Sequence, residues 1–183
     1  MAASYVVADP IIGVPTPVTE TGTVQKFPLG LQVKAFDRQS GTGNVGAGVF
    51  QYCAGYSTAS SAAKGQFVQI RNNQAWILLA AQSTFMAPIG VAAGNLSNTN
   101  VYGWVQVQGI ADYCTYAGSD VPAGKPQYIC AGTGGIVLSN QVAGNQVYGV
   151  VPPVSLASAS SAANAGVYQL NYPFLAGVTA ANT

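Results

Sequence analysis

Histidine is absent from this chain of 183 residues, and charged side chains are scarce. The chain holds 6 Lys or Arg and 5 Asp or Glu, so 6% of its residues are charged, whereas ordinary soluble domains reach about 25%. A net charge of +1 offers no basic surface for phosphate contacts, which argues against a nucleic-acid partner. Because charge keeps copies of a protein apart, so neutral a surface predicts that neighbouring molecules cover much of it.

The shortage of ionisable groups also removes most routes to catalysis. General acid–base chemistry usually needs a tunable base or a pair of carboxylates. The five acidic residues are scattered at Asp9, Glu20, Asp37, Asp112 and Asp120. Asp112 and Asp120 could flank one loop as a glycosidase pair, but nothing places them at a catalytic separation. We therefore expect no enzymatic activity, no catalytic residue and no cofactor.

Cysteine is limited to Cys53, Cys114 and Cys130, an odd number with wide spacing. Each follows an aromatic or aliphatic residue in a strand-like run, where a free cysteine behaves as a small buried apolar side chain. We expect buried free thiols, with a single disulfide as the alternative. Without histidine or a C-x-x-C motif, zinc lacks its usual ligands, so no metal site is expected.

Long apolar runs are missing as well. Prolines and amides break even the charge-free segment after Lys125 well short of the ~20 apolar residues that a membrane-spanning helix needs. The N-terminus shows no basic region followed by an apolar block and a cleavage site. The sequence therefore predicts neither a membrane partner nor a secretory signal.

An alternation of period two is the clearest positive feature. From Val101 to Val107 the odd positions hold Val or Gly and the even positions hold Tyr, Trp or Gln, as in a pleated strand. The core of this stretch, which starts at Gly103, has echoes that start at Gly48 and Gly166. Each consists of Gly, two large apolar residues, Gln and one more apolar residue. We expect residues 101–110 to form a central strand.

Two segments are typical of hairpins, and each precedes a short strand. Asn72 and Asn73 separate the strands of the first hairpin, and Asn tolerates the positive φ of a tight turn. The expected strands are 65–71 and 74–79 before the short strand 89–91, and then 128–130 and 136–138 before the short strand 148–150. We interpret these as two similar strand–hairpin–strand units, 48–91 and 103–150, with a closing strand at 166–174. Chance likeness in a chain rich in Gly, Gln and Val is the alternative.

The expected fold is all-β, a compact antiparallel β-sandwich or small barrel built from these two units. It comprises an extended N-terminal arm (1–25), a single β domain (26–177) and a flexible tail (178–183). Residues 24–36 are expected to form the first strand of the domain, and residues 155–165 a short helix or a surface loop. The stretch Gly41–Gly46 matches G-x-G-x-x-G, but a strand follows it instead of a helix, which argues against nucleotide binding.

The arm combines prolines with aliphatic residues. Its prolines favour an extended path and forbid a helix. Its aliphatic side chains would gain stability by burial, so we expect the arm to lie against its own domain or a neighbour, with a frayed terminus as the alternative. The candidate partner-interface residues are Pro10, Ile11, Ile12, Val14, Pro15, Pro17 and Val18. Deleting residues 1–18 is expected to weaken attachment and leave the β body folded.

The order of these motifs resembles that of small structural proteins of tailed-bacteriophage heads, and capsid decoration (cement) proteins are the nearest class. The motifs are Lys26-Phe27-Pro28-Leu29-Gly30, Gly48-Val49-Phe50, a hairpin, Ile89-Gly90-Val91-Ala92, Tyr102 to Gly109, and Ala123-Gly124 before another hairpin. The resemblance spans roughly residues 24–151 and rests on pattern.

The resemblance implies a β-rich homotrimer on the outer surface of the virion head, assembled in the host cytoplasm, that bridges capsomers and stabilises the shell. Its implied partners are the major capsid protein, its own copies and neighbouring decoration subunits. The near absence of charge departs from acidic, highly soluble decoration proteins.

That departure leaves open a phage fibre or a carbohydrate- or receptor-binding module displayed on the virion. Tyr56, Tyr113 and Tyr116 lie in or beside expected loops. Aromatic faces there would provide contact area for a sugar or a protein at small entropic cost. Packing of these rings in or over the sheet is the alternative.

Overall fold

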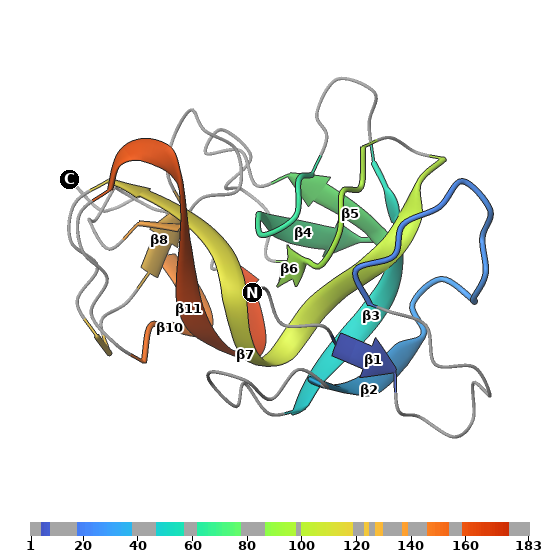
Figure 1. Cartoon of the computed structure of the whole chain (residues 1–183), viewed down its shortest axis with the longest axis horizontal. Coiled ribbons are helices and arrows are strands. Elements are labelled where there is room, and N and C mark those ends of the chain that lie inside the picture. The colour runs from blue at the N-terminus through green and yellow to red at the C-terminus, as the bar shows by residue number, and fades with distance from the viewer. Residues whose placement is uncertain are drawn as a thin grey trace, which may run out of the picture.

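The computed structural model describes residues 5–7, 18–37, 47–56, 62–77, 87–97, 100–118, 123–124, 127–129, 137–138, 146–153 and 159–175. These residues form one 11-stranded sheet and contain no helix, so the expected all-β class is confirmed (Figure 1). It follows that no helix with the length and apolarity of a membrane span occurs in these ranges. The strands are β1 (Tyr5–Val7), β2 (Gln32–Asp37), β3 (Ala47–Gly55), β4 (Phe67–Arg71), β5 (Gln74–Ile77), β6 (Ala87–Ala92), β7 (Tyr102–Gly118), β8 (Gln127–Ile129), β9 (Val137–Leu138), β10 (Gln146–Val151) and β11 (Ala159–Leu175).

Five of the strands close into a small barrel in the order β3-β5-β4-β6-β7, with β7 pairing back onto β3. The β3–β5 contact is parallel, at Ala54↔Gln74, and the other four contacts of the barrel are antiparallel. The expectation of a small barrel is therefore confirmed for this part of the chain. The remaining strands extend the sheet on both sides of the barrel.

Strand β7 is the central strand, as the alternation of residues 101–110 predicts, and it continues to Gly118. Its first half pairs with β3 and β6, and its second half pairs with β11, for example at Ala111↔Tyr168. Gly109 lies between the two halves with a φ of 96°, a conformation that glycine adopts without strain. Figure 1 shows β7 crossing the molecule with a marked bend. One strand thus joins the barrel to the part formed by β8, β10 and β11.

The two faces of β7 pack into two different cores. Trp104 belongs to a cluster on the outer side of the barrel strands, and its neighbour Val105 belongs to a second cluster. The buried members of the first cluster are Val18, Val33, Ala35, Phe50, Tyr52, Ala93 and Trp104. Those of the second are Cys53, Ala62, Val68, Ile70, Ala75, Ala92, Leu96, Val101, Val105 and Val107. The period of two therefore supplies apolar side chains to both sides of the strand.

The first predicted hairpin is confirmed. Arg71 pairs with Gln74 across the turn, and Asn72 and Asn73 have φ values of 48° and 60°. Two consecutive positive φ angles are what a two-residue hairpin turn of the right twist requires. Farther along the chain, β8 and β9 pair antiparallel at Tyr128↔Leu138.

Two segments differ from the sequence prediction. Residues 24–31 are not part of the first strand, because Leu31 N donates to Pro28 O (3.2 Å) in a turn that includes Gly30 at a φ of 85°. Residues 159–165 are neither helix nor surface loop but belong to β11, since β7 supplies backbone partners, for example Thr115 for Ala165. Residues 154–158 lie outside the described ranges.

The three Gln residues of the repeated motif lie in unrelated settings, so the motif does not mark equivalent positions. Gln106 is fully buried, Gln51 is half-buried beside Asn73, and Gln169 is exposed. The order of pairing nevertheless agrees between the two halves, since β5-β4-β6-β7 is matched by β9-β8-β10-β11. The likeness of the halves therefore lies in strand order and not in the Gln-containing motif.

Gln106 holds the bend of β7 by three side-chain hydrogen bonds. Its Nε2 donates to Gln108 O (3.2 Å) and Ile110 O (3.1 Å), on either side of Gly109, and its Oε1 accepts from the Tyr113 hydroxyl (2.8 Å). These bonds tie the backbone on both sides of Gly109 to one buried side chain.

We expect Gln106→Leu to lower the free energy of unfolding by about 1–3 kcal/mol, because it removes the three hydrogen bonds of a buried amide. Chemical denaturation followed by circular dichroism measures the effect. Gln169→Leu, at the exposed Gln of the same motif, is the matched control and should change stability by at most ~0.5 kcal/mol. Equal losses in the two variants would contradict the assigned role of Gln106.

Candidate functional site

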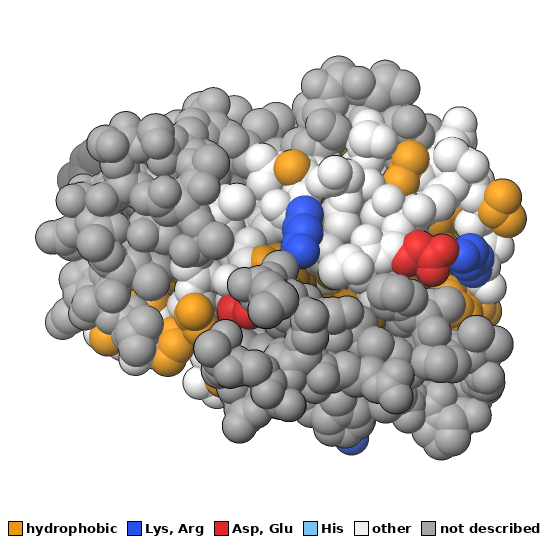
Figure 2. Space-filling model, viewed as in Figure 1, with side chains coloured by type: hydrophobic (Ala, Val, Ile, Leu, Met, Phe, Trp, Pro, Cys, Tyr) orange, Lys and Arg blue, Asp and Glu red, His pale blue; other side chains and the backbone are white. Residues whose placement is uncertain are grey.

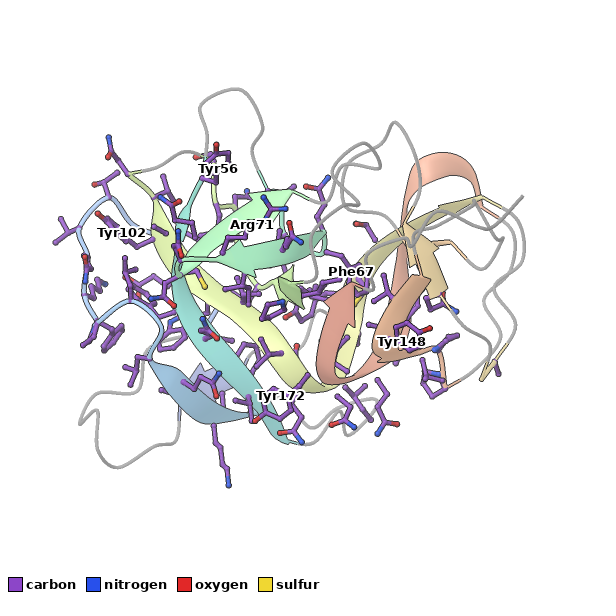
Figure 3. All side chains as sticks on the ribbon, turned by 180° about the vertical axis from the view of Figure 1, so that it is seen from behind. Tyr56, Phe67, Arg71, Tyr102, Tyr148 and Tyr172 are labelled. Atoms are coloured by element: carbon purple, nitrogen blue, oxygen red, sulfur yellow. The ribbon has the colours of Figure 1, made fainter. Side chains whose placement is uncertain are left out.

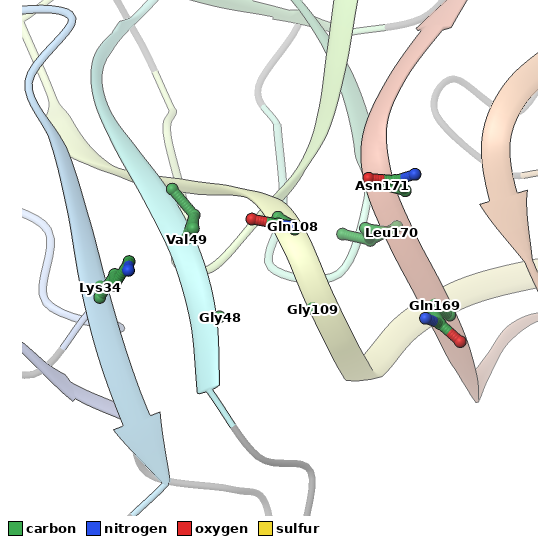
Figure 4. Close-up of a pocket in the computed structure, with 8 residues that line it drawn as sticks. All are labelled: Lys34, Gly48, Val49, Gln108, Gly109, Gln169, Leu170 and Asn171. Carbon is green, nitrogen blue, oxygen red and sulfur yellow. The ribbon is translucent and has the colours of Figure 1, made fainter.

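Strands β2, β3, β7 and β11 contribute to two hollows, and β6 also lines the smaller one. The larger, of about 400 Å³, is lined by Lys34, Gly48, Val49, Gln108, Gly109, Gln169, Leu170 and Asn171 (Figure 4). The smaller, of about 250 Å³, is lined by Gln32, Gln51, Pro88, Ile89, Val107, Tyr172 and Pro173. We call the two hollows together the amide groove, after their polar side chains Gln32, Gln51, Gln108, Gln169 and Asn171.

The larger hollow follows one cross-strand row. Lys34 pairs with Val49, Val49 pairs with Gln108, and Gln108 pairs with Asn171. Four neighbouring strands at ~4.8 Å spacing make this row about 14 Å long. Figure 4 shows the four residues on four successive strands. The row brings together residues that lie far apart in the sequence.

Strand alternation explains why polar side chains face the groove. On β2, Gln32 and Lys34 are exposed whereas Val33 and Ala35 are buried in the first core. On β3, Val49 and Gln51 are half-buried whereas their neighbours Phe50 and Tyr52 pack into that same core. Burial of one face therefore fixes the opposite face as the wall of the groove.

Gly48 lets β3 lie close to β7 where both strands line the larger hollow. A Cβ on Gly48 would lie 2.9 Å from the Gln106 amide and 3.1 Å from Gln108 O, so only glycine allows β3 to approach β7 this closely. On β10, which lines neither hollow, a Cβ on Gly149 would lie 2.6 Å from Asn171 O of β11. At these two points β3 is packed closely against β7, and β10 against β11.

Tyr172 has a strained backbone at the rim of the smaller hollow. The pairing of β10 and β11 jumps from Val150↔Leu170 to Tyr148↔Phe174, so residues 171–173 bulge opposite Gly149. In this bulge Tyr172 has a φ of 43° although it is not glycine, and its side chain is 50% exposed. Such a conformation costs about 1–3 kcal/mol, and residues that adopt it cluster at functional sites.

Hydrogen bonds fix one side of the groove. Gln32 Nε2 donates to Gln51 Oε1 (3.1 Å), and Gln51 Nε2 donates to Asn73 Oδ1 (3.3 Å), which extends the chain of amides to the β4–β5 hairpin. Lys34 is the one charged residue among the described residues that line the two hollows. The groove is therefore close to neutral and rich in groups that both donate and accept hydrogen bonds.

Reactive groups lie elsewhere in the described part of the chain. No carboxylate or thiol is among the described lining residues. Cys53 and Cys114 are buried free thiols, as expected, and Cys130 lies outside the described ranges. Burial raises the pKa of Cys53 to about 12, which keeps it protonated. Among the described residues no group of three potential ligands could hold a metal ion.

The described parts of the N-terminal arm lie on their own chain. Strand β1 pairs with β2, for example at Val6↔Phe36, and Val18 is fully buried in the first core. Val18 therefore lies in the domain interior and not on a surface for a partner. The other six candidate interface residues, Pro10, Ile11, Ile12, Val14, Pro15 and Pro17, lie outside the described residues.

Two of the three tyrosines that the sequence singles out, Tyr56 and Tyr113, are not among the described lining residues of the amide groove. Tyr113 bonds to Gln106 and packs against the first core, Tyr56 is half-buried near the end of β3, and the side chain of Tyr116 is outside the described set. The sequence analysis did not single out Tyr172 on β11. On β2 and β3, the exposed polar positions that alternate with buried ones are a signal for the polar wall of the groove.

No family model matches this chain, and neither a curated protein nor a solved structure does. The fold and the groove alone therefore define its class, an all-β barrel protein with a neutral, amide-lined surface groove.

Proposed function

We propose that this protein is a non-enzymatic structural component of a bacteriophage particle, bound on the outer surface of the head, where it bridges capsomers and stabilises the shell. The observation that supports this most is the scarcity of charge, with 6 Lys or Arg and 5 Asp or Glu in 183 residues. Within the described ranges one ion pair is present, between Lys26 and Glu20, and it is solvent-exposed. Figure 2 shows few charged side chains among the described residues of one face, and an acidic and a basic one lie side by side there.

A surface of this kind favours assembly. Little like-charge repulsion opposes close approach of further copies or of a shell protein. Several apolar side chains are also exposed, among them Val24 (71%) and Val151 (41%), and these would gain stability when covered. The proposed partners are the major capsid protein, neighbouring decoration subunits and further copies of this chain as a homotrimer.

The arm offers a way to attach. The order of the sheet ends at β1 on one side and at β9 on the other. A short outer strand such as β1 presents backbone groups to which another chain can add a strand. Many such modest contacts on a symmetric lattice combine by multivalency to raise the free energy needed to open the shell.

We also infer that the β domain, residues 26–177, contains two copies of one strand–hairpin–strand unit. The matched pairing orders of β5-β4-β6-β7 and β9-β8-β10-β11 support this inference. Superposition of the two units in an experimental structure tests it, and unrelated backbone paths would contradict it.

Removing residues 1–17 should weaken attachment to the shell about tenfold. A loss of only about 1.4 kcal/mol of binding free energy is enough for a tenfold lower affinity. The deletion must stop before Val18, because removal of that buried side chain would also open the core. The occupancy of the variant on purified particles is compared with that of the full chain, and thermal unfolding checks that the body remains folded. Unchanged occupancy would contradict the role of the arm.

Electron microscopy of particles that carry this chain tests the proposal as a whole. We expect density at regular positions on the outside of the shell. Projecting fibres would favour the alternative placement, and absence of the chain from the particle would overturn the proposal.

A further inference from the structure

We propose that the amide groove binds a neutral oligosaccharide, with Gln108, Gln169 and Asn171 bonding to its hydroxyl groups and Tyr172 packing its ring against a sugar. This binding is a separate activity from attachment to a shell. It uses a surface formed by β2, β3, β6, β7 and β11, and none of its described lining residues belongs to the arm, residues 1–25.

The size and shape of the groove suit a short chain. The two hollows have volumes of about 400 and 250 Å³, on the scale of the ~300–1,000 Å³ typical of ligand sites. Both are lined by neighbouring residues of β2, β3, β7 and β11, the smaller one also by β6, and the cross-strand row that ends at Asn171 spans four strands. The site is therefore elongated and open, which suits more than one sugar ring.

The polar groups of the groove match hydroxyl groups. Each side-chain amide carries two N–H donors and a carbonyl acceptor, so one residue can donate a hydrogen bond to a hydroxyl group or accept one from it. Gln169 and Asn171 are exposed, and their side chains make no hydrogen bond to another residue of the described part of the chain. The bonds between Gln32, Gln51 and Asn73 hold the opposite wall in place.

Tyr172 provides the apolar contact. Its ring is half exposed at the rim of the smaller hollow, and Figure 3 shows it on the outer side of the molecule. The strained φ of 43° is not compensated by full burial of the side chain, which points to a functional reason for the conformation. An aromatic face at this place offers contact area to a sugar ring at small entropic cost.

The backbone of the groove disfavours an extended peptide as the ligand. Leu170 pairs with Gly109 on one side and Val150 on the other, and Val49 pairs with Lys34 and Gln108. The strands that form the floor are therefore paired on both sides and offer no free edge for strand addition. Recognition must come from side chains. Only Lys34 among the described lining residues is charged, which favours a neutral ligand over an ionic one.

An array that carries neutral oligosaccharides, acidic oligosaccharides and extended peptides, probed with the full chain, tests this proposal. Titration calorimetry with the neutral oligosaccharide that is retained best then compares variants. We expect Asn171→Ala and Tyr172→Gly each to bind about tenfold more weakly. Tyr172→Gly should also melt at the same or a higher temperature, because glycine relieves the positive φ.

Tyr148→Ala is the matched control, since Tyr148 is an exposed tyrosine on the neighbouring strand β10 and does not line the groove. Its binding should equal that of the unmodified chain. Retention of only acidic oligosaccharides, retention of only peptides, or no retention would each overturn the proposal. It would also fail if Tyr172→Gly and Asn171→Ala bound as tightly as the control.

Discussion

Replacing Trp104 with alanine is expected to lower the free energy of unfolding by about 3–5 kcal/mol, the usual cost of truncating a fully buried large aromatic side chain. The indole is 1% exposed, and its ring centroid lies 4.9 Å from that of Tyr52 and 5.4 Å from that of Phe27. The cavity would open in the first core, where β3, β7 and the segment before β2 meet. Urea denaturation followed by far-ultraviolet circular dichroism measures the loss without depending on tryptophan fluorescence.

Two variants show whether the loss comes from packing. Trp104→Phe retains an aromatic ring and should lose markedly less stability than the alanine variant. Val24→Ala removes apolar atoms from a side chain that is 71% exposed and should change stability by at most ~0.5 kcal/mol. An alanine variant of Trp104 with the denaturation midpoint of the original chain would show that this core does not hold the fold together.

Gly65→Ala is the second large effect, with an expected loss of about 2–5 kcal/mol. Gly65 has a φ of 87°, which costs about 1–2 kcal/mol for a residue with a Cβ. The added Cβ would lie 2.2 Å from Tyr113 O, and relief of this clash by backbone movement costs about 1–3 kcal/mol more. The movement would strain bonds to both neighbours, since Gly65 N donates to Ala92 O (2.8 Å) and Gly65 O accepts from Thr115 N (2.9 Å).

Gly124→Ala is the control that separates the cost of the positive φ from the cost of the steric clash. Gly124 also has a positive φ, 70°, but a Cβ there would meet nothing within 4 Å. It should therefore lose only the ~1–2 kcal/mol of the backbone conformation. Thermal and urea unfolding of both variants give the difference. Equal losses would mean that the contact of the added Cβ with Tyr113 O has no cost, which would contradict the close packing of β7 against Gly65.

The elements that the sequence predicts correctly are those determined by neighbouring residues. Asn72 and Asn73 tolerate the positive φ angles of the hairpin turn by themselves, and the alternation from Val101 to Val107 is a property of a single strand. The sequence predictions are wrong where the conformation of a segment depends on partners far away in the sequence. Residues 159–165 are small and carry no strong apolar face, yet they form a strand because β7 offers them backbone hydrogen bonds. The turn that contains Gly30 is held by a bond from Gly30 N to Tyr52 O (2.8 Å), which no local pattern reveals.

The amide groove could not be predicted for the same reason. Lys34, Val49, Gln108 and Asn171 become neighbours only through the registers of three strand pairings. The local sequence around a Gln in a strand does not show whether its side chain faces solvent or the interior. The repeated motif shows this, since Gln106 is buried while Gln169 lies at the rim of the groove. The strained φ of Tyr172 depends on the bulge opposite Gly149, and that bulge is likewise a product of pairing.

The sharing of β7 between early and late partners has a consequence for synthesis. All five strands of the barrel have been made once Gly118 is added, whereas β11, the partner of the second half of β7, ends at Leu175. At about 5–20 residues per second, roughly 3–11 s separate these two points on the ribosome. Pairings between such distant segments also form slowly after release. Throughout this interval the nascent chain exposes the second half of β7 without its partner, so that half-strand is where we expect chaperones to bind and aggregation to begin.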